Sequence, residues 1–200
     1  MRYRSVACML VLALAVSVRA ETFVIHAGGK NNEVVFESKA PMESFKGRTN
    51  QISGSIEADL SQLADSLSFR IEVDLASLDT GIGLRNQHMR DNHLETDTFP
   101  IAVFAGGNVE STTSPALTRG ASATVRLAGE LSLHGVTRPV EIDVNLTLAE
   151  SGVLNVSGDF VINLSDHDIK RPKFLVLKLA DEQKIHVGFT AQPVSMNASN

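Results

Sequence analysis

The feature that most constrains this sequence is a strict alternation of apolar and polar residues that recurs through most of its length. In Val140–Leu148, every second residue is aliphatic and the residues between them are polar or charged. Successive side chains of a β-strand point to opposite faces, so such a segment buries one face and exposes the other. Long helical periodicity is absent. The alternation therefore predicts an all-β protein built from antiparallel strands.

Ten segments are expected to form strands. Closing so many strands into a barrel of about eight or more removes the exposed sheet edges, although a β-sandwich has a similar pattern and stays an alternative. We expect short hairpin loops at Ala149–Val153 and Ala180–Lys184, and a longer, flexible loop at Gly107–Ala121. The expected strands are Phe23–His26, Glu33–Ser38, Ile52–Leu60, Leu67–Leu75, Ile101–Val109, Thr124–Leu133, Val140–Leu148, Leu154–Leu164, Phe174–Leu179 and Lys184–Thr190.

The interior of such a barrel would be apolar. Gly54, Gly129 and Gly158 fall on the apolar faces of their strands, where glycine marks a bend or a close approach by another group. A barrel of about eight strands has room for packed side chains or for one slim ligand. From alternation alone, the packed interior is favoured, because every β-protein needs a core.

The first twenty residues differ from the rest. Arg2 and Arg4 precede an apolar run from Ala7 to Val18, and small residues precede a cleavage point after Ala20. This pattern predicts a signal peptide at residues 1–20 and a single domain at residues 21–200. No later apolar run approaches the roughly 20 residues that a membrane-spanning helix needs. We therefore expect an exported protein, periplasmic or secreted, that does not span the membrane.

Composition excludes several kinds of chemistry. The single cysteine, Cys8, leaves with the predicted signal peptide, so disulfides, thiolate catalysis and cysteine zinc sites are excluded. Removing the arginines of the signal peptide leaves 15 basic residues against 23 acidic ones, a net charge of about −8. An acidic chain without basic aromatic patches argues against nucleic acid as a partner.

Two blocks of sequence are more specific than the alternation. Ser77–Phe104 contains a Ser-x-Asp-Thr sequence, then Arg-x-x-His-x-Arg, then Phe-Pro-x-x-x-Phe. Leu127–Leu146 contains Gly-x-Leu-Ser-Leu-x-Gly-Val-Thr-Arg-Pro-Val. In this order and spacing, the two blocks resemble the signature of the YceI-like polyisoprenoid-binding family.

The resemblance implies an extended, lipocalin-like antiparallel β-barrel that holds a long isoprenoid or similar lipid in a central tunnel. It implies an exported protein with no cofactor other than a bound isoprenoid or quinone lipid. Similar proteins commonly dimerise, which allows a homodimer here. The chain has Asp91-Asn92-His93-Leu94 where the family often has Ser-(Ala/Ser)-(Asp/Glu)-Phe, and this difference leaves the identity of the ligand open.

The polar segment Arg85–Asp97 allows three interpretations. His88 and His93 could bind a metal, but their spacing of five does not align them on one helical face. His88 could act as a general base, but no serine lies in a nucleophile-elbow sequence and no cysteine is left. The third interpretation is a short helix or turn that closes one mouth of the barrel.

We favour the third interpretation and predict neither catalytic residues nor metal ligands. The predicted function is a non-enzymatic binder or carrier of a long-chain lipid. The alternatives are a hydrolase or metal-binding protein that uses the His88/His93 cluster, and a filled barrel that acts through protein contacts. The predicted ligand-binding residues are Arg85, His88 and Arg90 at the mouth and, along the tail, Phe69, Ile71, Val73, Leu131, Leu133, Val144, Phe160 and Ile162.

Overall fold

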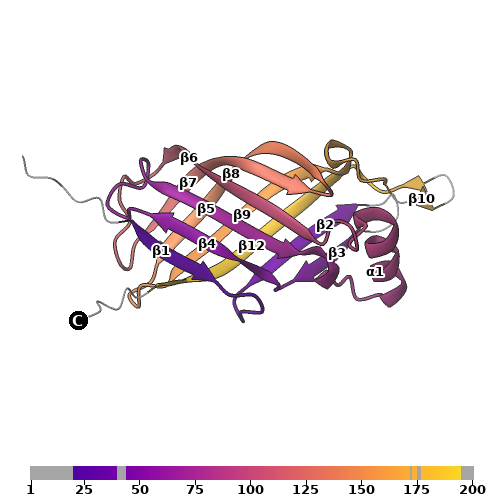
Figure 1. Ribbon diagram of the computed structural model, residues 1–200, viewed down its shortest axis with the longest axis horizontal. Helices are drawn as coiled ribbons and strands as arrows, with labels where there is room; N and C mark the ends of the chain where they lie inside the picture. The colour runs from indigo at the N-terminus through magenta and orange to yellow at the C-terminus, as the bar shows by residue number, and fades with distance from the viewer. Residues whose placement is uncertain (1–19, 40–43, 172, 175–176, 195–200) are drawn as a thin grey trace, which may run out of the picture.

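The strands wrap into one antiparallel barrel with a helical segment at one end (Figure 1). The computed structural model describes residues 20–39, 44–171, 173–174 and 177–194, so the predicted signal peptide lies outside the described residues except for Ala20. The barrel strands are β1 (Glu21–Ile25), β2 (Glu33–Lys39), β3 (Ser44–Thr49), β4 (Ile52–Ala58), β5 (Leu67–Asp74), β6 (Ile101–Thr112), β7 (Ser122–Leu133), β8 (Val136–Leu148), β9 (Leu154–Asn163) and β12 (Glu182–Pro193).

The sheet closes on itself through β12. One edge of β12 pairs with β9 along its length; the other pairs with β1 near Gln192 and with β2 from Gln183 to Gly188. The closed ring contains eight strands, which pair in the order β1, β4, β5, β6, β7, β8, β9 and β12 and back to β1. Strands β2 and β3 extend this sheet from the other part of the β12 edge. The predicted all-β antiparallel barrel is confirmed.

Four details of the sequence-based prediction were wrong. The expected hairpin loop Ala180–Lys184 overlaps β12, which begins at Glu182 and does not pair with the described strand before it. Strand β3 was not predicted, because its sequence alternates poorly. Strand β6 continues to Thr112, so the first part of the expected loop Gly107–Ala121 is strand. The expected strand Phe174–Leu179 is instead two short strands, β10 (Lys173–Phe174) and β11 (Leu177–Lys178), which pair with each other outside the barrel sheet.

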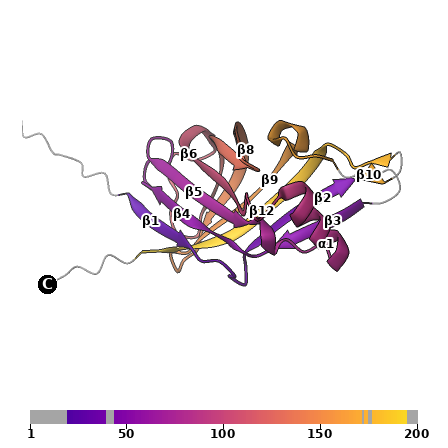
Figure 2. The same ribbon diagram turned by 45° about the vertical axis from the view of Figure 1, so that its right-hand side comes forward.

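Short helical elements gather at the end of the barrel where β2, β3 and β10 lie (Figure 2). They are the 3₁₀ turn η1 (Leu75–Ser77), the helix α1 (Gly83–Met89), the single π-helical stretch η2 (Arg90–Leu94) and the 3₁₀ turn η3 (Leu164–His167). We call the segment from Gly83 to Leu94 the lid. Within the described part of the chain, no helix is long and apolar enough to cross a membrane.

Glycine lets neighbouring strands approach closely at two positions. Gly54 has φ +144°, and a Cβ atom there would collide with the backbone carbonyl of Arg70 on β5. A Cβ atom at Gly129 would lie 2.8 Å from the carbonyl oxygen of Ala105 on β6. Both positions therefore require glycine because the neighbouring strand approaches closely, which is one of the two roles predicted from their place on the apolar face.

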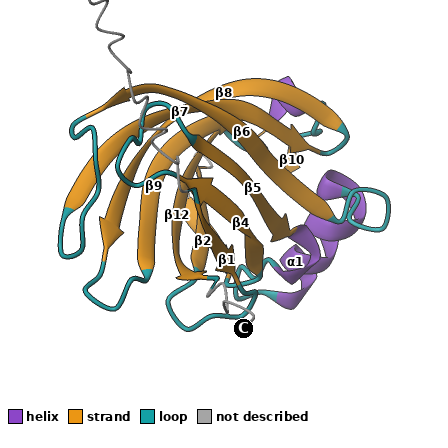
Figure 3. Ribbon diagram, turned by 60° about the vertical axis from the view of Figure 1, so that its left-hand side comes forward, coloured by secondary structure: helices purple, strands orange, loops and turns teal. Residues whose placement is uncertain are grey.

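Figure 3 turns the end of the barrel opposite the lid toward the viewer, where loops join the strands. Two loops, at residues 59–66 and 113–121, are hydrogen-bonded to each other. The Leu63 N–H donates to Pro115 O at 2.9 Å, and the Leu117 N–H donates to Leu60 O at 2.7 Å. Leu63 and Leu117 are both buried in the main hydrophobic core. These contacts close the far end of the barrel with apolar side chains.

Candidate functional site

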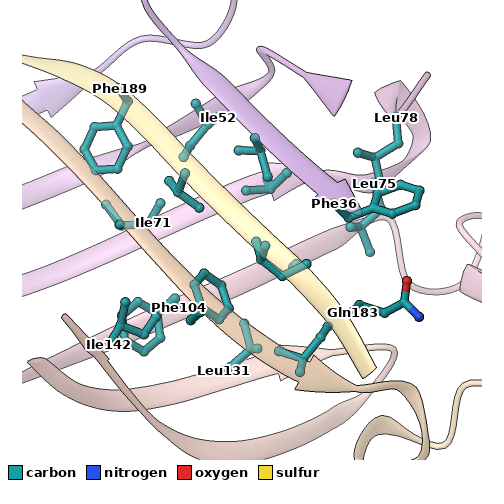
Figure 4. Close-up of a pocket in the computed structure, with 18 of the residues that line it drawn as sticks. Phe36, Ile52, Ile71, Leu75, Leu78, Phe104, Leu131, Ile142, Gln183 and Phe189 are labelled. Atoms are coloured by element: carbon teal, nitrogen blue, oxygen red, sulfur yellow. The ribbon is translucent and has the colours of Figure 1, made fainter. Parts of the chain in front are cut away.

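The barrel interior is hollow. It contains a cavity of about 700 Å³, which is within the range of pockets that hold one small molecule. The prediction of a packed interior, which alternation alone favoured, is therefore wrong. Figure 4 shows aliphatic and phenylalanine side chains from several strands pointing into this space. Among the residues that line the cavity, the polar side chains are those of Arg85, His88, His93 and Gln183.

The structure brings most of the predicted ligand-binding residues to this cavity. Arg90 and Leu133 do not line it: Arg90 extends toward the Ala76 carbonyl oxygen at 3.4 Å, and Leu133 packs with Leu75 and Leu78 beneath the lid. The predicted residues that do line the cavity are Arg85, His88, Phe69, Ile71, Val73, Leu131, Val144, Phe160 and Ile162. Their contact with a ligand stays a prediction.

Asn86 fastens the lid to the chain that enters it. Its Oδ1 atom accepts hydrogen bonds from the Thr80 N–H at 2.8 Å and the Thr80 hydroxyl at 2.6 Å. Its Nδ2 atom donates to Asp79 Oδ1 at 2.7 Å. Hydrogen bonds from the Gly81 N–H and from Asn86 lower the pKa of Asp79, which keeps this carboxylate ionised as an acceptor. The Ser-x-Asp-Thr sequence thus anchors the lid.

Arg85 joins the lid to the barrel wall. Its Nε atom donates to Thr80 Oγ1 at 2.9 Å, and its Nη2 atom donates to Thr80 O at 2.8 Å. The guanidinium carbon lies 4.3 Å from the centre of the Phe45 ring on β3. That ring meets Phe36 of β2 edge-on, with centroids 6.0 Å apart. Arg85 therefore sits at the mouth with much of its hydrogen-bonding and stacking capacity committed to the protein.

The ring of His93 is held by a backbone carbonyl. Its Nδ1 atom lies 2.8 Å from Lys170 O, and because a carbonyl oxygen only accepts, Nδ1 carries the proton. Burial, together with the nearby His88, lowers the pKa of His93, although the Lys170 carbonyl opposes this. The neutral ring leaves Nε2 as an acceptor at the cavity wall. No group of three His, Cys, Asp or Glu side chains in the described residues is placed to hold a metal ion.

Exposed apolar residues at the start of the lid and just before it also lie at the cavity. Ile82 and Leu84 are 51% and 64% exposed, yet both line the cavity. Residues that face both solvent and cavity mark its opening, so the mouth lies beside the start of α1. The far end, at Leu60 and Leu63, is covered by the loops that close the barrel.

Gln183 and Phe45 line the cavity but were not predicted. Gln183 shares the inward face of β12 with Ile185, Val187 and Phe189, so the alternation of that strand could have revealed it. Phe45 lies in β3, whose sequence Ser-Phe-Lys-Gly-Arg-Thr contains a single large apolar residue. Nothing in that sequence indicates an inward-facing strand.

Comparisons with known proteins agree with this architecture. The chain is 32% identical to a UPF0312 protein of Vibrio parahaemolyticus over 136 residues, which cover 67% of each chain. BcnA of Burkholderia cenocepacia superposes with a TM-score of 0.66 at 20% identity, covering 80% of this chain and 96% of BcnA. A polyisoprenoid binding domain from Saccharophagus degradans, implicated in plant cell wall breakdown, gives the same TM-score at 17% identity, covering 88% and 100%.

A family model supplies the remaining comparison. The model of the YceI-like domain matches residues 26–191, which include β2 to β9, β12 as far as Ala191, and both blocks of sequence noted above. Because the match covers most of the chain, this protein belongs to the family of YceI-like domains.

Proposed function

We propose that this protein binds a long-chain amphiphile, such as a polyisoprenoid or a quinone with an isoprenoid tail, inside its barrel. The observation that carries the proposal is the hollow interior of about 700 Å³ with its almost wholly apolar lining. Burial of a lipid tail there removes apolar surface from water, worth roughly 25 cal/mol per Å². The resemblance to a polyisoprenoid binding domain supports the same class of ligand.

The lining gives the ligand a direction. The polar lining residues Arg85, His88 and His93 come from the lid, and Gln183 stands at the start of β12. Leu63, Leu67 and Leu154 line the opposite part of the cavity, without polar side chains. The headgroup would therefore lie beneath the lid and the tail would run toward Leu63.

We also propose that the protein is exported and acts as a carrier rather than as an enzyme. The apolar run in the first twenty residues supports export to the periplasm or beyond. The polar groups at the mouth support binding rather than catalysis. His93 is held by a backbone carbonyl, and Arg85 contacts Thr80 and Phe45.

The test is to purify the protein natively from its exported fraction, extract it with organic solvent and identify the extract by mass spectrometry. We expect one long-chain species near one molecule per chain, absent from an unrelated barrel treated in the same way. Light scattering of the same sample gives the number of chains per particle and so tests the homodimer. An empty extract that stays empty after isoprenoids and quinones are offered would contradict the proposal.

A matched pair of variants controls this test. Ile71 lines the cavity, so Ile71→Trp would fill part of the space and reduce lipid recovery. Glu72 is the next residue of β5 and its side chain is 36% exposed on the other face, so Glu72→Trp adds the same ring outside the cavity. We expect lipid recovery to fall in the first variant and to stay unchanged in the second.

A further inference from the structure

Gln183 is a buried amide in an otherwise apolar wall. It is 4% exposed, it lines the cavity, and Figure 4 shows its amide at the edge of the group of aliphatic and phenylalanine side chains. Its Nε2 atom donates to Ala180 O at 2.9 Å. Because a carbonyl oxygen cannot donate, this bond fixes which end of the amide is nitrogen. The carbonyl end, Oε1, receives no hydrogen bond from any residue that the structure describes.

A second polar group without a partner stands beside it. Ser38 of β2 lies directly opposite Gln183 in the strand register and is fully buried. Its Oγ atom has no hydrogen-bond partner among the described residues. Buried polar groups in folded proteins are nearly always hydrogen-bonded. Ser38 is not among the residues that line the cavity, whereas Gln183 is, so the acceptor that a ligand in the cavity can reach is Gln183 Oε1. A ligand hydroxyl would supply the hydrogen bond that this acceptor lacks.

These groups lie at the end of the cavity where the headgroup would be. Ile185, the next inward residue of β12, pairs with Phe36, and the Phe36 ring meets Phe45 beneath Arg85. Gln183 is one inward position nearer the rim than Ile185. His93 of the lid also lines this end of the cavity, and its Nδ1 bond to Lys170 O leaves Nε2 as an acceptor.

At this end of the cavity, the arginine side chains of the lid are poorly placed to bind an anionic headgroup. The Arg85 guanidinium already donates to Thr80 and stacks on Phe45, and Arg90 lies outside the cavity. His88 has both a donor and an acceptor nitrogen, so the lining side chains that offer an acceptor alone are those of Gln183, through Oε1, and His93, through Nε2. An acceptor-only ligand, such as a ketone or an ether, would leave both unpaired.

We propose that the cavity selects an uncharged long-chain amphiphile whose headgroup carries a hydroxyl, and that Gln183 Oε1 accepts the hydrogen bond from this hydroxyl. The inference rests on the proposed function and narrows it to long-chain alcohols, phenols and quinols. Ketones, ethers and charged phosphates of the same chain length are disfavoured. Gln183 is then the residue that determines specificity, while the apolar wall supplies affinity.

The test is a competition between two probes that differ only at the donor. Delipidated protein is offered equal amounts of geranylgeraniol and its methyl ether, and native mass spectrometry counts each bound species. We expect the alcohol to be preferred about tenfold, because the ether leaves the buried acceptor unpaired. In Gln183→Leu the preference should disappear, while the ether still binds. Gln87→Leu, an exposed glutamine of α1, should keep the wild-type preference.

The possible outcomes distinguish failure of the Gln183 hypothesis from failure of lipid binding. Equal binding of both probes to the wild type, or a preference for the ether, would overturn the role of Gln183 and leave lipid binding intact. Retention of the alcohol preference in Gln183→Leu would overturn it as well. Failure of both probes to bind any variant would overturn the proposed function itself. Gln183→Met, which keeps an unbranched side chain of similar length, replaces Gln183→Leu if that variant does not fold.

Discussion

The guanidinium of Arg85 lies over the face of the Phe45 ring, with 4.3 Å between its central carbon and the ring centroid. This pair is a side-chain contact between the lid and β3, a strand that the sequence did not predict. Cation–π contacts at partly exposed sites contribute roughly 0.5–1 kcal/mol. The stacked pair therefore couples the position of the lid to the barrel wall.

The first prediction concerns this coupling. In a double-mutant cycle of Arg85→Gln and Phe45→Leu, the free energy of unfolding should show an interaction of about 0.5–1 kcal/mol between the two positions. Phe45→Leu keeps the wall apolar, so the cycle measures the contribution of the contact between the guanidinium and the aromatic ring. Chemical denaturation of the four proteins measures it, and strictly additive effects would show that the stacking contributes nothing.

The second prediction concerns Asn86. Asn86→Ala removes the acceptor for both Thr80 donors and the donor to Asp79. Each such bond contributes about 0.5–1.5 kcal/mol, so the lid should open more readily than the barrel unfolds. Hydrogen exchange should show faster exchange at residues 83–94 and unchanged exchange in β7 and β8. Gln87→Ala on the same helix is the control, and equal exchange in both variants would contradict the anchoring role.

The third prediction compares two glycines. Gly54→Ala places a Cβ atom against the Arg70 carbonyl at a φ that L-residues rarely adopt, and it should destabilise the protein by more than about 1 kcal/mol. Gly83 begins α1, and no atom lies within 4 Å of an added Cβ. Gly83→Ala should be neutral or stabilising by up to ~1 kcal/mol. Thermal unfolding of both variants measures the difference. Equal shifts of the two unfolding midpoints from that of the wild type would contradict the prediction.

The fourth prediction concerns pH. Burial lowers the pKa of His93 below its ordinary value of 6.5, so the unfolded chain binds this proton more readily than the folded one. The contribution of His93 to stability is therefore complete above pH 6.5 and declines as the pH falls below that value. His93→Asn keeps a donor for Lys170 O without titrating. Denaturation at several pH values should show a shallower decline in this variant, whereas an identical decline would exclude His93 as its source.

The barrel was predictable because alternation and burial coincide along most strands. In β8, Ile142, Val144, Leu146 and Leu148 are buried and the residues between them are not. Strand β3 was not predicted because its inward positions after Phe45 are Gly47 and Thr49, which carry no hydrophobic signal. Gly47 is required there because the ring of Phe36 occupies the space of a Cβ atom.

The site was less predictable than the wall. Alternation identified inward residues such as Ile71 and Phe160, but it could not tell a filled interior from a hollow one. That difference depends on how opposite walls are spaced. Arg90 was predicted at the mouth because it lies in the polar segment with Arg85 and His88, whereas it begins the π-helical stretch η2, and its side chain extends toward Ala76. Gln183 shares the alternation of Ile185, Val187 and Phe189, but a polar residue on an inward face gives no hydrophobic signal of its own.

The closed far end sets how a chain-like ligand would come and go. With Leu63 and Leu117 sealing that end, a tail that enters beneath the lid must withdraw along the same path, so the part that enters first leaves last. Each buried methylene adds about 0.8 kcal/mol that has to be lost on the way out, which slows release roughly fourfold per carbon. Residence time would then grow steeply with tail length until the cavity is full. A barrel closed in this way would retain its cargo in water and release it where another apolar phase receives the tail as it emerges.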